Sequence, residues 1–118
     1  MELDQLTYQI IGCAMRVHNE LGAGFQEIIY QRSLAIELEK EGLPFEREKE
    51  QTIFYKGSPV GTRRADFVVD SKIIVELKAL STIDDLHLVQ AKNYLTAYAV
   101  PVGLLINFGG LSLQYKKI

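Results

Sequence analysis

The chain has little of what several protein classes require. It contains one cysteine, Cys13, and no tryptophan in 118 residues. A single thiol excludes an internal disulfide and any iron–sulfur or zinc site that this chain would build from thiolates alone. This cysteine content is typical of a reducing compartment, so we expect a cytoplasmic protein with Cys13 in its core.

Long apolar runs are also missing from the sequence. No stretch approaches the roughly 18 consecutive apolar residues of a membrane-spanning helix. The first residues include Glu2 and Asp4, whereas a secretory leader would be basic at this point. We therefore expect neither a membrane partner nor export.

A surplus of positive charge, common in nucleic-acid-binding domains, is absent as well, since the net charge is −2. The charge is uneven, however. Residues 1–45 contain three Lys or Arg and seven Asp or Glu, whereas residues 46–118 contain ten and eight. We expect any phosphate-contacting surface to lie in the later part.

The composition that remains is that of a folded domain. Apolar residues make up 47% of the chain and charged residues 24%, which excludes the polar composition of disordered proteins. The sequence shows no internal repeat and no linker. We therefore expect a single domain over residues 1–118.

Apolar periodicity predicts three helices. The first covers Leu3 to Leu21 and ends at the glycine-rich residues 22–24, and the second runs from about residue 26 to 41. The third opens with two overlapping capping boxes in residues 81–85 and reaches about Tyr98. Its core-facing stripe contains Leu88, Ala91, Leu95 and Tyr98.

Strand patterns lie between and after these helices. Two antiparallel strands flank a turn at residues 56–59, and the first of them is expected at a sheet edge. A third strand covers residues 73–78, a fourth, buried on both faces, covers residues 102–106, and a hairpin at Gly109 and Gly110 leads to a fifth. The predicted order is α-α-β-β-β-α-β-β in an α/β domain.

Charged residues interrupt two of these apolar strands. Asp66 precedes Phe67, and Glu76 and Lys78 flank Leu77. A buried charge without a partner costs several kcal/mol, so these groups are expected to have one. Alternation places Glu76 and Lys78 on one face of their strand.

Whether Asp66 reaches the same place depends on the hairpin. A two-residue loop would pair Asp66 with Val75, while a three-residue loop or a bulge brings Asp66 opposite Glu76. Two carboxylates are hard oxygen ligands suited to Mg²⁺ or Mn²⁺, and an adjacent lysine suits phosphodiester hydrolysis. The alternative interpretation is that all three are ordinary surface charges.

Asp66 followed by Glu76, Leu77 and Lys78 resembles the Asp…Glu-x-Lys signature of the PD-(D/E)XK nuclease superfamily. Residues 24–30, Gly-Phe-Gln-Glu-Ile-Ile-Tyr, resemble the pattern of its GxxExxY branch. The resemblance implies a restriction-endonuclease-like three-layer core with a mixed sheet flanked by helices. It also implies catalytic residues Asp66, Glu76 and Lys78.

The resemblance further implies an acidic metal ligand from the helix before the sheet, here Glu27, beside Asp66 and Glu76. Glu27 also ends the stripe formed by Tyr30, Leu34 and Leu38, which points it toward the core. The alternative is that Glu27 only complements the positive end of its helix dipole.

Gln90 and Tyr94 resemble a Gln-x-x-x-Tyr element that contacts the substrate strand in part of the superfamily, and His87 shares their helix face. The alternative for this pair is ordinary helix surface. Arg63 and Arg64 adjoin Asp66 on its strand, and alternation assigns Arg64 to the Asp66 face, so we expect Arg64 as the substrate contact. The alternatives are that Arg63 contacts phosphate or that both arginines only balance neighbouring acids.

The sequence thus predicts a Mg²⁺- or Mn²⁺-dependent nuclease acting on DNA, with RNA or a nucleotide not distinguished as substrate. The alternative is a nuclease-fold module that binds nucleic acid or protein without catalysis. A chain of this size covers little of a duplex, so a homo-oligomer is plausible.

Overall fold

The computed structural model describes residues 1–98 and 100–118, apart from the side chain of Tyr94. Within these residues no helix combines the length and the apolar character needed to cross a membrane. The element order is the predicted one. The elements are α1 (Leu3–Leu21), α2 (Glu27–Lys40), β1 (Phe45–Tyr55), β2 (Ser58–Val69), β3 (Ile73–Lys78), α3 (Asp85–Tyr98), β4 (Val102–Asn107) and β5 (Gln114–Lys117).

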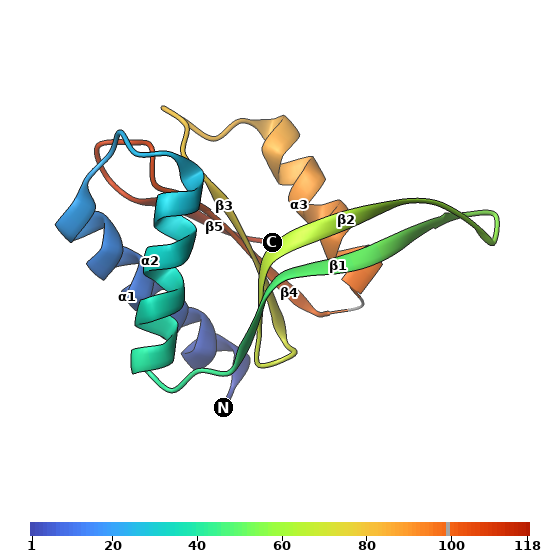
Figure 1. Cartoon of the computed structure of the whole chain (residues 1–118), viewed down its shortest axis with the longest axis horizontal. Helices are drawn as coiled ribbons and strands as arrows, with labels where there is room; N and C mark the ends of the chain where they lie inside the picture. Colours follow the sequence, from blue (N-terminus) through green and yellow to red (C-terminus); the bar gives the residue numbers. More distant parts are fainter. Residues whose placement is uncertain (99) are drawn as a thin grey trace.

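Five strands form one mixed sheet in the order β1-β2-β3-β4-β5, with β3 and β4 parallel and the other neighbours antiparallel. Helices α1 and α2 cover one face of the sheet and α3 lies on the other (Figure 1). This three-layer α/β arrangement is that of the restriction-endonuclease-like fold. As predicted, β1 is an edge strand and every residue of β4 is buried.

The main core forms between the first two helices and the sheet. It includes Cys13, as expected, and the fully buried Tyr30, whose ring stacks on Phe108 at 4.7 Å between centroids. The Tyr30 hydroxyl donates to the Gly22 carbonyl at 2.6 Å and accepts the Phe25 N–H at 3.2 Å. This tyrosine therefore fixes the glycine-rich turn that leads into α2.

The loop between β2 and β3 has the three residues, 70–72, that the site hypothesis requires. Phe67 pairs with Val75 and Val69 with Ile73, which brings Asp66 opposite Glu76. Asp70 and Ser71 take positive φ angles of 51° and 55° to make the turn. The predicted longer loop is confirmed.

The pleat of β2 changes parity next to Asp66. Ala65 and Val68 pack in the same cluster against α3, although strict alternation would place them on opposite faces. On the neighbouring strand, Glu48 has a φ of 54° between two paired positions. Upstream of Asp66, the odd-numbered residues of β2 therefore face α3.

Beyond this point β1 and β2 continue as a long hairpin that projects from the body of the molecule (Figure 1). We call residues 49–65 the arm. Tyr98 of α3 ties its root, because its hydroxyl accepts the Ala65 N–H at 2.9 Å and bonds to the carbonyl of Lys49. The arm thus starts where the helix ends.

Helix α3 begins later than the capping boxes at residues 81–85 predicted. Asp84 caps it instead, since its Oδ1 accepts the His87 N–H at 3.1 Å while the Asp84 N–H donates to His87 Nδ1 at 3.3 Å. The preceding segment is held by the buried Asn107, whose amide bonds both the N–H and the carbonyl of Leu80 at 2.8 Å. A Cβ on Gly109 would lie 2.3 Å from Leu80. Because this segment is clamped to the end of β4, the helix cannot start at Ser81.

Candidate active site

The acids of the Asp…Glu-x-Lys pattern lie where β2 and β3 separate. The Asp66 N–H donates to Glu76 Oε1 at 3.3 Å, and the Leu77 N–H donates to Asp66 Oδ2 at 2.8 Å. The two carboxylates therefore accept backbone N–H groups at the point where strand pairing, which extends to Phe67 and Val75, stops. We call this place the rift.

Gln31 of α2 is a third participant that the sequence analysis missed. Its Nε2 donates to Asp66 Oδ1 at 2.8 Å, so both Asp66 oxygens are hydrogen bonded. The side-chain oxygen of Gln31 is buried and has no hydrogen-bond partner among the described residues. Gln31 lies four residues after Glu27, on the same side of the helix, and this spacing was the signal available in the sequence.

Burial and mutual repulsion disfavour ionisation of the acids at the rift. Burial, and then the charge of Asp66, raises the pKa of Glu76 to about 8. The same two causes raise the pKa of Glu27, and burial raises that of Asp66 against the hydrogen bonds from Leu77 and Gln31. The Lys78 ammonium lowers all three values. The three acids and Lys78 therefore interact electrostatically, although Glu27 is solvent-exposed.

The three predicted metal ligands are electrostatic neighbours and not a preformed cage. Within the described part of the chain, no three His, Cys, Asp or Glu residues gather in a group that could hold an ion. Asp66 is instead turned toward protein donors. The donor chemistry nevertheless fits a hard divalent cation, because the carboxylates are crowded and costly to ionise without a cation, and a buried amide oxygen lacks a partner.

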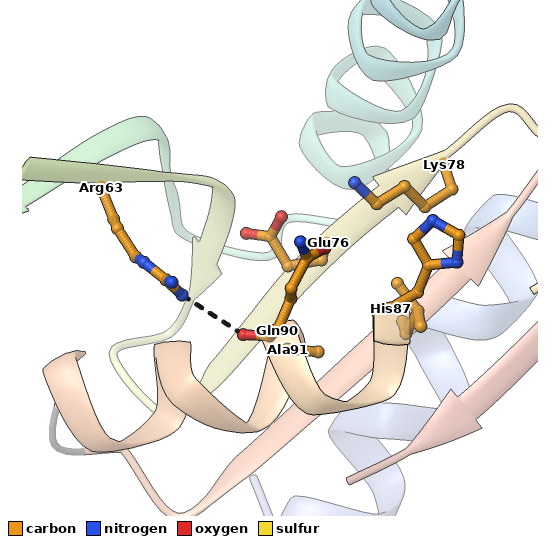
Figure 2. Close-up of a pocket in the computed structure, with 7 residues that line it drawn as sticks. Arg63, Glu76, Lys78, His87, Gln90 and Ala91 are labelled. Atoms are coloured by element: carbon orange, nitrogen blue, oxygen red, sulfur yellow. Dashed lines mark hydrogen bonds between the residues drawn. The ribbon is translucent and has the colours of Figure 1, made fainter. Parts of the chain in front are cut away.

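A cavity of about 300 Å³ opens beside the rift on the α3 side, and we call it the acid pocket. Glu76 and Lys78 line it from β3, and His87 and Gln90 from α3 (Figure 2). The His87 Nδ1 lies 2.8 Å from Asp84 Oδ1, and Figure 2 shows the ring turned toward Lys78. The remaining lining residues are Arg63, Ala91 and Leu105.

Gln90 thus reaches the pocket, as the substrate-contact hypothesis requires. The expectation for the Tyr94 side chain lies outside the described residues. The two arginines beside Asp66 lie in different surroundings. Arg64 ion-pairs with Glu48 at 4.0 Å and Glu50 at 3.8 Å on β1, which fits the alternative that it balances neighbouring acids, while Arg63 lines the pocket. Arg63 lines the pocket because the odd-numbered residues next to the parity change face α3.

The Gly-x-x-Glu-x-x-Tyr pattern divides into structural and site positions. Gly24 has a φ of 107°, which favours glycine. Tyr30 fixes the turn from the other end. Glu27, the first residue of α2, interacts with Asp66 and Lys78 and also sits at the positive helix terminus. Glu27 is therefore compatible with both interpretations, as a residue of the site and as a complement to the helix dipole.

Comparison with known proteins follows this geometry. A family model described as the PD-(D/E)XK nuclease superfamily matches residues 4–118. A search among curated proteins found no match. A solved structure titled "Crystal structure of SSO0001" is similar in fold, with a TM-score of 0.62 and 23% sequence identity over 76% of this chain. The match covers 48% of that chain, so the present chain spans about half of its length. Because the family model matches nearly all residues, the chain belongs to the PD-(D/E)XK nuclease superfamily.

Proposed function

We propose that this protein is a divalent-metal-dependent nuclease that cleaves DNA, and that it belongs to the GxxExxY branch of its superfamily. The observation that carries the proposal is the pair of backbone N–H bonds at the rift, from Asp66 to Glu76 Oε1 and from Leu77 to Asp66 Oδ2, next to Lys78. Asp66, Glu76 and Lys78 thereby bring two carboxylates and an amine together where the pairing of β2 with β3 ends. We also propose that residues 1–118 act as a single nuclease domain.

Glu27, Asp66 and Glu76 are the proposed ligands for Mg²⁺ or Mn²⁺. Such an ion supplies an activated water and stabilises negative charge on the phosphate. Its charge would offset the burial that raises the pKa of each acid, and the repulsion from Asp66 that further raises those of Glu27 and Glu76. Gln31 orients Asp66 through its hydrogen bond.

Lys78 projects beside the acids and is the proposed catalytic amine. Its positive charge orients the attacking water and balances charge that develops on the phosphate oxygens. Gln90 of α3 and Arg63 of β2 also line the acid pocket and are the proposed contacts to the substrate backbone. An arginine at this position suits a phosphate group.

A thermal-stability titration with Mn²⁺ tests the metal site. The wild type should be stabilised by about 2.7 kcal/mol at a metal concentration of 100 Kd. Asp66→Ala and Glu76→Ala should lose this gain, while Glu39→Ala, which removes an exposed acid on α2, should keep it. Equal gains in all four proteins would refute the assignment of the ligands.

Cleavage of linear, nicked and single-stranded DNA, with RNA for comparison, then tests the activity. Lys78→Ala should keep the Mn²⁺ stabilisation and lose cleavage by about 10²-fold or more. Cleavage of RNA alone would overturn the DNA assignment.

One observation favours a second candidate, a nuclease-fold module that binds nucleic acid without cutting it. Both Asp66 oxygens are already engaged by protein donors. For this candidate the wild type would bind DNA, but no divalent ion would stabilise it or induce cleavage.

A further inference from the structure

A second cavity lies between the arm and α3. Its volume is about 490 Å³, within the range of small-ligand sites. The residues that line it are Gln51, Thr52, Ile53, Phe54, Arg63, Asn93, Thr96 and Ala97. We call it the arm cavity, and none of the roles assigned above uses it.

The chemistry of this lining differs from that of the acid pocket. Gln51 and Asn93 offer amides that can donate and accept hydrogen bonds, and Phe54 offers an aromatic ring that is 62% exposed. Arg63 is the one charged residue among the eight described residues of the lining, and no carboxylate faces the cavity from them. A flat group with hydrogen-bonding edges and an adjacent anion matches this combination.

Arg63 connects the two cavities, because it lines both. Its guanidinium also donates to the Gln90 carbonyl at 3.5 Å, which holds it against α3 between them (Figure 2). A polymer that leaves the acid pocket along α3 passes this cation before it reaches the arm cavity. The repeat of a nucleic-acid strand, one phosphate and one base, fits such an alternation.

We propose that the arm cavity binds an unpaired nucleobase of the substrate strand, next to the scissile phosphate. This inference rests on the proposed function and adds a preference for single-stranded or frayed nucleic acid. Phe54 stacks on the base, Gln51 and Asn93 contact its edge, and Arg63 binds the intervening phosphate. Inside an intact duplex, neighbouring base pairs cover the faces of each base and pairing occupies its edge, so such a base does not enter.

The tip of the arm has a further exposed aromatic ring. Tyr55 is 63% exposed, and the Lys56 ammonium lies 5.4 Å from the centre of its ring. Exposed aromatic rings combined with cations are the elements of sequence-tolerant single-strand binding.

Binding measurements without cleavage test the proposal. Fluorescence anisotropy is followed with a labelled ten-nucleotide oligothymidine and with an abasic strand of equal length, in EDTA. Phe54→Ala should weaken oligothymidine binding about 5- to 150-fold, which corresponds to about 1–3 kcal/mol for one stacked base. It should leave abasic-strand binding unchanged. Tyr8→Ala, which removes a 79% exposed aromatic ring on α1, is the matched control and should change neither affinity.

Equal losses for the two strands, or no loss, would overturn the inference. So would a Phe54→Ala protein that loses affinity only because a dimer dissociates, which sedimentation measurements detect. The two proposals fail separately. A base-dependent loss without cleavage by the wild type supports the cavity and refutes the nuclease, whereas cleavage without a base-dependent loss refutes the cavity alone.

Discussion

The backbone N–H groups of β2 and β3 have different hydrogen-bond partners at the two ends of the strand pair. At the loop end, Phe67 to Val69 pair with Ile73 to Val75, and all of these side chains are buried. At the other end the strands part, and the carboxylates of Asp66 and Glu76 accept the backbone N–H groups.

The comparison shows how a site can be built from a sheet. The loop end uses apolar packing and ladder hydrogen bonds, which favour stability. At the rift, acids with raised pKa values take the place of strand pairing. Such groups lower the stability of the folded protein, which is common at functional positions. Changes at the two ends should therefore have opposite effects on stability.

The largest effect is expected at the loop end. Phe67 is completely buried and packs edge-to-face on Phe45, so Phe67→Ala should lower the free energy of unfolding by about 3–5 kcal/mol. The same substitution at the exposed Phe54 should change it by about 0.5 kcal/mol or less. Urea denaturation of both variants gives the difference, and equal losses would remove the contrast.

A change at the rift should act in the opposite direction and depend on pH. The Glu76 pKa is raised from 4.5 to about 8, so the folded state binds the proton more tightly than the unfolded state. Stability without metal should therefore fall as pH rises from about 4.5 to 8 and level off above that range. Glu76→Gln should flatten this curve and be more stable than the wild type at pH 9, by on the order of a few kcal/mol.

Unfolding free energies measured from pH 4 to 9 in EDTA check this prediction. Parallel curves for the wild type and Glu76→Gln would mean that the rift carries no electrostatic cost at Glu76.

The smallest effect is expected at Gln31, which connects α2 to the rift. Gln31→Leu removes a hydrogen bond to Asp66, but it also removes a buried oxygen without a described partner. The free energy of unfolding should therefore fall by only about 1 kcal/mol. The Mn²⁺-induced stabilisation should decrease because Asp66 is less well oriented. Gln5→Leu, at an exposed position of α1, should alter neither quantity. An unchanged response to Mn²⁺ in Gln31→Leu would exclude a positioning role.

Local patterns were sufficient to predict the architecture. Apolar periodicity gave the order of helices and strands, because each element buries a face with its own repeat. The requirement that Asp66 lie opposite Glu76 predicted the length of the loop at residues 70–72, and the pairing of Phe67 with Val75 confirms it.

Features set by distant contacts were not predictable from these patterns. Which of the two arginines lines the acid pocket depends on the parity change beside Asp66, which the sequence does not show. The start of α3 depends on Asn107, which lies 27 residues beyond Leu80. The bond from Gln31 to Asp66 spans 35 positions and leaves no local sequence pattern except helical spacing.

The contacts of Asn107 and Gly109 with Leu80 limit which sequence changes this protein tolerates. Leu80 lies between Lys78, the proposed catalytic amine, and the first turn of α3, which carries His87. Asn107 at the end of β4 and Gly109 just beyond it therefore govern the spacing between two walls of a cavity that they do not line. Grafting this catalytic strand onto another scaffold would require transplanting that asparagine and glycine with it.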